Sequence, residues 1–182
     1  EFRLQHLDDE RGRQVLQSLS EQMAADAAGS SDTLSQGIAF ARYKNAAAYC
    51  AVGIELEVSE QANVRLIRAW IVADAGEIVD PAGITAQLEG GLIQAASWSL
   101  YETVTYDANG VTSRDWDTYP ILRFNNVPHV HTLLIDRPGE PFLGAGEAVG
   151  GPTGGAIANA IRRATGLCVS RMPFNQNNIR AA

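Results

Sequence analysis

The sequence predicts an α+β fold in which packed helices cover a mixed, largely antiparallel sheet. Segments with strand character follow one another as hairpins, instead of alternating with helices as they do in βαβ units. Three other segments have apolar residues at helical spacing. The chain of 182 residues has no internal repeat and no long linker, so we expect a single domain or one lobe of a larger one.

The first part of the chain is predicted to form a helix and three strands. Asp8-Asp9 caps a helix that runs to about Ala27. The apolar face of this helix consists of Val15, Leu16, Leu19 and Met23. A polar loop over residues 29–35 is expected to be the most mobile segment. Strands are predicted over residues 37–44, 47–58 and 64–73, with a hairpin turn at 60–63.

A long helix is predicted to begin at Asp80-Pro81, because Asp caps free N–H groups and Pro is tolerated in the first turn. Gly90-Gly91 inside it should cost about 1 kcal/mol each relative to Ala, so we expect another backbone or a ligand to approach there. The remaining predicted elements are strands over 103–106, 111–116 and 129–136, a glycine-rich loop over 139–155, a helix over 152–164 ended by Gly166, a short strand over 167–172 and a polar tail.

Composition argues against several classes of protein. The net charge is -7 and the basic residues are scattered, which does not fit a nucleic-acid-binding surface. No run approaches the roughly 20 apolar residues of a membrane span. Cys50 fits a buried hydrophobe, and without a CxxC pair a thiolate zinc site or iron–sulfur cluster is not expected on this chain. The start at Glu1, without Met or a signal-peptide pattern, suggests part of a longer subunit, so no compartment is predicted.

The residues best suited to chemistry lie in the stretch Gly144-Ala145-Gly146-Glu147, which is followed by further glycines and a helix. Backbone N–H groups at such a turn suit an anion, whereas the carboxylate of Glu147 suits proton abstraction better. The alternative is an ordinary glycine-rich loop with a solvated Glu. Neither a Walker pattern nor a dinucleotide-binding GxGxxG unit is present.

Gln87 and a pair of histidines are further candidates for a functional role. The amide of Gln87 can donate and accept hydrogen bonds, as the edge of a heterocycle requires, although Gln87 could equally be a surface residue on a helix. His129 and His131 share one face of a predicted strand, but no third metal ligand is spaced nearby.

Four segments occur in one order along the chain: Ala41 to Asn45, Val79 to Gly91, Asp117 to Arg123, and Gly144 to Glu147 with the helix after it. Together they make the chain resemble the C-terminal part of the molybdopterin-binding large subunit of the xanthine oxidase/aldehyde oxidase family. The resemblance covers nearly the whole chain and is strongest to the isoquinoline 1-oxidoreductase beta-subunit type. It implies that residues 1–182 form the C-terminal lobe of a molybdopterin-binding domain.

The resemblance also implies site residues, a cofactor and partners. Glu147 corresponds to the general base beside molybdenum, Gln87 to a glutamine that touches the pterin, and Ala145 and Gly146 to backbone lining of the pocket. Ala148 stands where related sequences read Pro, which is expected to loosen the loop. The implied cofactor is molybdopterin cytosine dinucleotide with molybdenum, held in the full subunit and not in the isolated chain.

The implied partners are the rest of the large subunit, an iron–sulfur small subunit and a small-molecule substrate. The implied activity is oxidation of an aldehyde or N-heteroaromatic compound. The alternative is a non-catalytic domain of the same fold that serves assembly or ligand binding.

Overall fold

The computed structural model describes residues 2–26 and 33–182. The predicted helix end at Ala27 and most of the loop expected to be mobile lie outside the described residues. In chain order the elements are α1 (Phe2–Gln5), α2 (Glu10–Ala25), β1 (Ser35–Arg42), η2 (Tyr43–Asn45), β2 (Tyr49–Val58), β3 (Val64–Asp74), α3 (Pro81–Leu100), β4 (Tyr106–Asp107), β5 (Gly110–Val111), η3 (Phe124–Asn126), β6 (His129–Ile135), α4 (Gly150–Thr165) and α5 (Gln176–Arg180).

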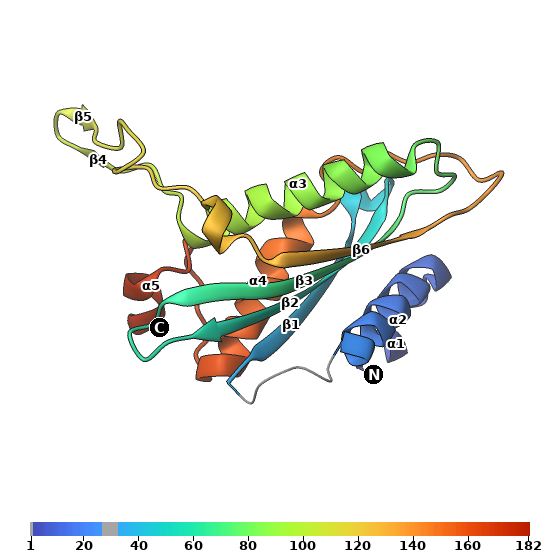
Figure 1. The fold of residues 1–182 in the computed structure, drawn as a ribbon, viewed down its shortest axis with the longest axis horizontal. Helices are drawn as coiled ribbons and strands as arrows, with labels where there is room; N and C mark the ends of the chain where they lie inside the picture. Colours follow the sequence, from blue (N-terminus) through green and yellow to red (C-terminus); the bar gives the residue numbers. More distant parts are fainter. Residues whose placement is uncertain (1, 27–32) are drawn as a thin grey trace.

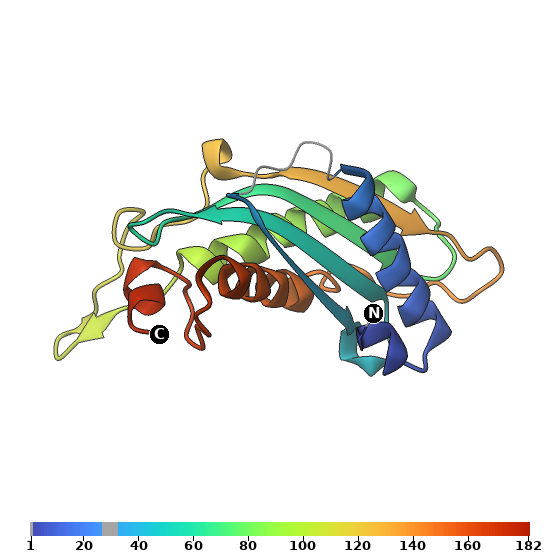
Figure 2. The same ribbon diagram turned by 90° about the horizontal axis from the view of Figure 1, so that it is seen from below.

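A four-stranded sheet forms the middle layer, with strand order β1-β2-β3-β6. The first three strands are antiparallel, whereas β6 runs parallel to β3. Helix α2 covers one face, and α3 and α4 cover the other (Figures 1 and 2). The predicted α+β class with a mixed, largely antiparallel sheet is therefore confirmed.

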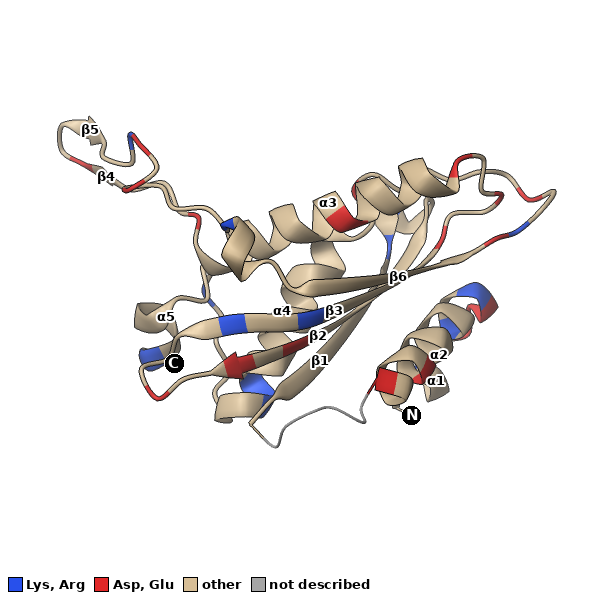
Figure 3. Ribbon diagram, viewed as in Figure 1, with Lys and Arg blue, Asp and Glu red and all other residues tan. Residues whose placement is uncertain are grey.

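The alternation of side chains along β2 divides the core between the two faces of the sheet. Val52, Ile54 and Leu56 pack with α3 and α4, whereas Tyr49 and Ala51 pack with α2. Glu55 also points to the α2 side, where it is fully buried and pairs with Arg68 at 2.7 Å. Acidic positions on β2 thus lie beside basic positions on β3 (Figure 3).

A close contact with a neighbouring side chain accounts for one of the two glycines predicted to mark an approach to α3. A Cβ added at Gly91 would lie 2.7 Å from Cγ1 of Val149, the residue just before α4. A Cβ at Gly90 would meet nothing within 4 Å, so no described part of the chain approaches that residue. The tight contact at Gly91 places the start of α4 directly against α3.

Several predictions for the second half of the chain were wrong. Residues 167–172 form no strand, and the expected polar tail contains α5, with Phe174 and Ile179 buried against the core. The strands predicted over 103–106 and 111–116 shrink to two-residue pieces, β4 and β5. This segment projects from the body of the molecule as an arm, so it has no layer to pack against (Figure 1).

Candidate functional site

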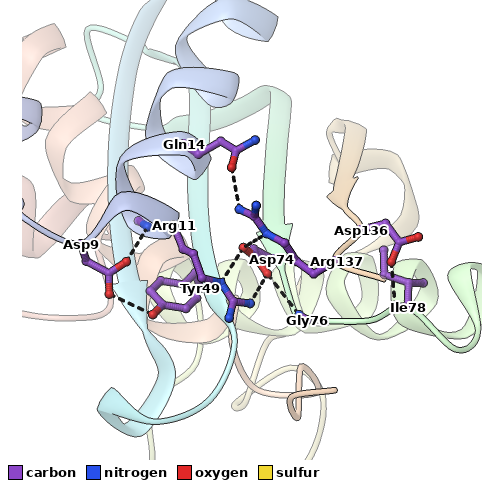
Figure 4. Close-up of polar contacts among 10 residues, drawn as sticks. Asp9, Arg11, Gln14, Tyr49, Asp74, Gly76, Ile78, Asp136 and Arg137 are labelled. Carbon is purple, nitrogen blue, oxygen red and sulfur yellow. Dashed lines mark hydrogen bonds and ion pairs between the residues drawn. The ribbon is translucent and has the colours of Figure 1, made fainter. Parts of the chain in front are cut away.

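The candidate site lies at the end of the sheet where β3 and β6 finish, next to the buried carboxylate of Asp74. Asp74, the last residue of β3, is fully buried and lies between the guanidinium groups of Arg11 and Arg137 (Figure 4). Nε of each arginine donates to Asp74 Oδ2 at 2.9 Å, and the Gly76 N–H donates to Oδ1 at 3.1 Å. Burial alone would raise the pKa of Asp74, but these hydrogen bonds outweigh burial and lower it below its usual value.

The Asp74 network connects α2 with the two loops that lead into the site. Gly76 adopts a positive φ of 76°, and a Cβ there would lie 2.0 Å from the Pro141 carbonyl oxygen. The loops are joined by two backbone hydrogen bonds, from Arg137 to Gly76 at 3.2 Å and from Leu143 to Ala75 at 2.7 Å. These two hydrogen bonds therefore hold in place the loop that precedes Gly144.

Three of the four predicted site residues line one surface depression. Gln87 on α3 faces Ala145 and Gly146, and a Cβ added at Gly146 would lie 3.3 Å from Gln87 Oε1. Gln87 is exposed, and its amide has no hydrogen-bond partner within the described part of the chain. The other lining residues are Ala75, Glu77, Val79, Asp80, Gly83, Ile84, Phe142 and Leu143.

Glu147 lies directly after this lining, in a turn held by backbone hydrogen bonds. The Ala148 N–H donates to the Ala145 carbonyl at 3.1 Å, and the Gly150 N–H donates to the Glu147 carbonyl at 3.3 Å. Ala148 is buried. A proline at position 148 could not make the first of these bonds. Ala148 therefore contributes a backbone hydrogen bond that a proline could not, and the expected loosening of the loop stays a prediction.

The Glu147 carboxylate does not line the depression but accepts a hydrogen bond from the Tyr43 hydroxyl. Tyr43 begins the 3-10 turn η2 between β1 and β2, 104 residues away in the sequence. It belongs to a segment that carries the family resemblance, but the sequence analysis assigned it no role. A tyrosine beside a turn is common, so only its contact with Glu147 singles it out.

This arrangement brings together two chemical capabilities. The free amide of Gln87 and the backbone at Ala145 and Gly146 can hydrogen-bond the edge of a heterocycle. Glu147 is an exposed carboxylate on the neighbouring residue and can accept a proton.

The other candidate residues do not form sites in the described structure. His131 stacks on Trp70 with ring centroids 6.3 Å apart, and no cluster of three metal-ligating residues occurs in residues 2–26 and 33–182. Cys50 is fully buried, which raises its pKa to about 12, and both it and the exposed Cys168 are free thiols. No helix among the described residues is long and apolar enough to cross a membrane.

Comparison with protein families matches residues 10–128 to the molybdopterin cofactor-binding domain. The whole chain aligns at 34% identity with a nicotinate dehydrogenase subunit of Pseudomonas putida, covering 17% of that protein. It also aligns over 96% of its length, at 31% identity, with the beta subunit of isoquinoline 1-oxidoreductase from Brevundimonas diminuta, covering 22% of it. The chain thus spans about a fifth of the length of these relatives.

Solved structures share the fold. Quinoline 2-oxidoreductase from Pseudomonas putida 86 superimposes with a TM-score of 0.68 at 22% identity, over 74% of this chain and 18% of that one. Aldehyde oxidoreductase from Desulfovibrio gigas gives a TM-score of 0.65 at 23% identity, over 74% of this chain and 15% of that one. At this identity the likeness concerns the fold alone.

Proposed function

This chain belongs to the molybdopterin cofactor-binding domain family, and from that premise we propose that residues 1–182 form the C-terminal lobe of a molybdenum hydroxylase or dehydrogenase that oxidises an aldehyde or N-heteroaromatic compound. The observation that carries the proposal is the convergence of Gln87 with the turn Ala145-Gly146-Glu147 at one end of the sheet. Gln87 comes almost 60 positions before Ala145 and Gly146, yet these three residues line one depression, and Glu147 follows directly after them.

The residues present fit the edge of a pterin. Gln87 offers a carbonyl oxygen and an amino group without an internal partner, and both are exposed at the depression. Gly146 has no side chain, and the Cβ of any other residue would crowd the Gln87 amide at 3.3 Å. Gln87, Ala145 and Gly146 would therefore hold the cofactor, which supplies two-electron redox chemistry when it is bound.

Glu147 would act as the general base of the reaction. Its carboxylate is exposed one residue beyond the proposed cofactor contacts, so it can take up a proton released while the substrate carbon is oxidised. A positioned base of this kind contributes about 10²–10⁴-fold to the rate. Backbone hydrogen bonds in the turn fix the Cα position of Glu147, from which its side chain extends.

The same proposal includes partners and the form of the cofactor. Both relatives named above are single subunits of larger enzymes, which supports partner subunits, among them an iron–sulfur small subunit that accepts the electrons. The rest of the large subunit would complete the pocket. The exposed apolar residues Trp116 and Phe124, which line one depression in the segment after β5, offer it a contact surface. We propose the cytosine dinucleotide form of molybdopterin as the cofactor.

The proposal is tested by comparing Glu147→Gln with Gln87→Ala in the full-length subunit assembled with its partners. Glu147→Gln should lower kcat by two to four powers of ten at nearly normal molybdenum content, because the amide cannot accept the proton. Gln87→Ala should lower the molybdenum and pterin content first. Glu140→Gln is the control, since Glu140 is an exposed carboxylate on the approach to the same turn and does not line the depression.

The comparison separates the proposal from its alternative. Activity per bound molybdenum that survives Glu147→Gln would exclude the general-base role. Normal cofactor content in the Gln87→Ala variant would exclude the proposed contact. If no cofactor bound to the full-length protein, the domain would be a non-catalytic member of the family.

A further inference from the structure

We propose that Tyr43 is a positioning residue that orients the Glu147 carboxylate toward the reacting atoms, an inference that rests on the proposed base role of Glu147. The Tyr43 hydroxyl donates a hydrogen bond to Glu147 Oε2. Within the described residues it is the only hydrogen-bond donor to this side chain, so Oε1 is left free to receive a proton.

Tyr43 is itself held firmly enough to serve as a reference point. Its N–H donates to the Ala48 carbonyl at 2.9 Å, and its carbonyl accepts from the Ala47 N–H at 2.9 Å. Its half-buried ring packs against the main hydrophobic core. The left-handed conformations of Lys44 and Asn45, with φ of 51° and 56°, close the turn tightly behind it.

A cation–π contact also holds the Tyr43 ring. Lys44 Nζ lies 5.1 Å from the centre of the Tyr43 ring. A cation over the ring face is attracted to the π electrons, so Lys44 helps to keep the ring in place. The turn therefore presents a positioned hydroxyl donor to Glu147.

Glu147 needs such a partner because its backbone is fixed but its side chain is long and exposed. Free rotation about its side-chain bonds would spread the carboxylate over many positions, and ordering it only in the transition state would cost entropy in every cycle. A donor at Oε2 selects one rotamer in advance. The turn between β1 and β2 thereby takes part in the site through Glu147, without touching the cofactor contacts at Gln87.

The contact is tested first by NMR on the 182-residue chain with ¹³C-labelled glutamate side-chain carboxyls and labelled tyrosine rings. Tyr43→Phe should move the Glu147 carboxyl resonance. Tyr119→Phe is the matched control, because the Tyr119 hydroxyl donates to Glu102 at 2.8 Å and its loss should move only the Glu102 resonance. Glu147→Gln should move the Tyr43 ring resonance, which tests the same contact without altering Tyr43. Unchanged resonances in both experiments would overturn the inference.

The positioning role is tested in the loaded full-length enzyme. Tyr43→Phe should lower kcat about tenfold with KM changed less than about twofold, since the base remains but is no longer oriented. Tyr119→Phe should leave both constants unchanged. An unaltered kcat in Tyr43→Phe would refute the role even if Glu147→Gln is inactive. If Glu147→Gln kept its activity, the base proposal itself would fail, while the NMR experiment would still decide whether Tyr43 holds the carboxylate.

Discussion

Replacing Asp74 by Asn should lower the free energy of unfolding of this chain by about 3 kcal/mol. Removing one partner of a buried ion pair typically costs about 3–5 kcal/mol, because the other charge stays buried without compensation. The lower end applies here, since the side chains of Arg11 and Arg137 keep 27% and 26% of their exposure and water can reach them. Asn also retains an oxygen that can accept from the Gly76 N–H.

Urea unfolding at pH 7, followed by circular dichroism, measures this change. The midpoint should fall with an unchanged slope, and the melting temperature should drop by about 6–12 °C for a chain of this size. Asp136→Asn is the control, because Asp136 is exposed and accepts one hydrogen bond, from the Ile78 N–H at 3.0 Å. A loss below about 1 kcal/mol in Asp74→Asn would refute the reasoning that this buried carboxylate stabilises the fold.

The effect of Asp74 should also depend on pH in a defined direction. The folded-state pKa of Asp74 lies below its usual value, so its contribution is fully present above the unfolded-state pKa of about 3.9. The contribution is lost as the pH falls through the folded-state pKa. The gap in stability between wild type and Asp74→Asn should therefore be constant near pH 7 and shrink below about pH 4; a gap that widens in acid would contradict the assignment.

Three further predictions concern other parts of the molecule. Gly76→Ala should lower the free energy of unfolding by about 2 kcal/mol or more in thermal unfolding, because the new Cβ would lie 2.0 Å from the Pro141 carbonyl oxygen. Gly139 also has a positive φ but open space around it, so Gly139→Ala should cost only about 1 kcal/mol. A thiol reagent should label the exposed Cys168 in the folded chain and Cys50 only after unfolding, since Cys50 is fully buried; equal labelling rates would contradict its placement. The purified 182-residue chain should contain no stoichiometric molybdenum by elemental analysis, because only the regions around Gln87 and Glu147 contribute proposed contacts; a full complement of metal would disprove this.

Local patterns along the sequence were sufficient to predict the four strands of the sheet and the three long helices that cover it. Asp9 and Asp80 cap α2 and α3 through hydrogen bonds to the N–H groups of Gly12 and Gly83, as their positions before apolar repeats predicted. Gly166 ends α4 with a φ of 75°, a conformation that disfavours other residues. Each of these features depends on residues within one or two turns, so the sequence alone contains the information.

Local sequence patterns were also sufficient to select part of the candidate site. Gln87, Ala145, Gly146 and Glu147 were selected from short motifs and from their order along the chain, and the structure brings the first three to one depression. Their roles in cofactor binding and catalysis stay predictions. The sequence also offered no means of separating Gly90 from Gly91, because only the position of Val149 decides which glycine is needed.

Contacts between distant residues were decided by the tertiary structure alone. Arg11 and Arg137 each lie 63 positions from Asp74, and Tyr43 lies 104 positions from Glu147. Phe174 and Ile179 looked like part of a polar tail, yet both are buried. A short motif reports the conformation of its own backbone, whereas these contacts depend on how strands pair and how helices pack over them. The sequence by itself therefore determined the main helices and strands and four candidate residues. The packing of α2, α4 and the loops around the sheet decided which side chains meet.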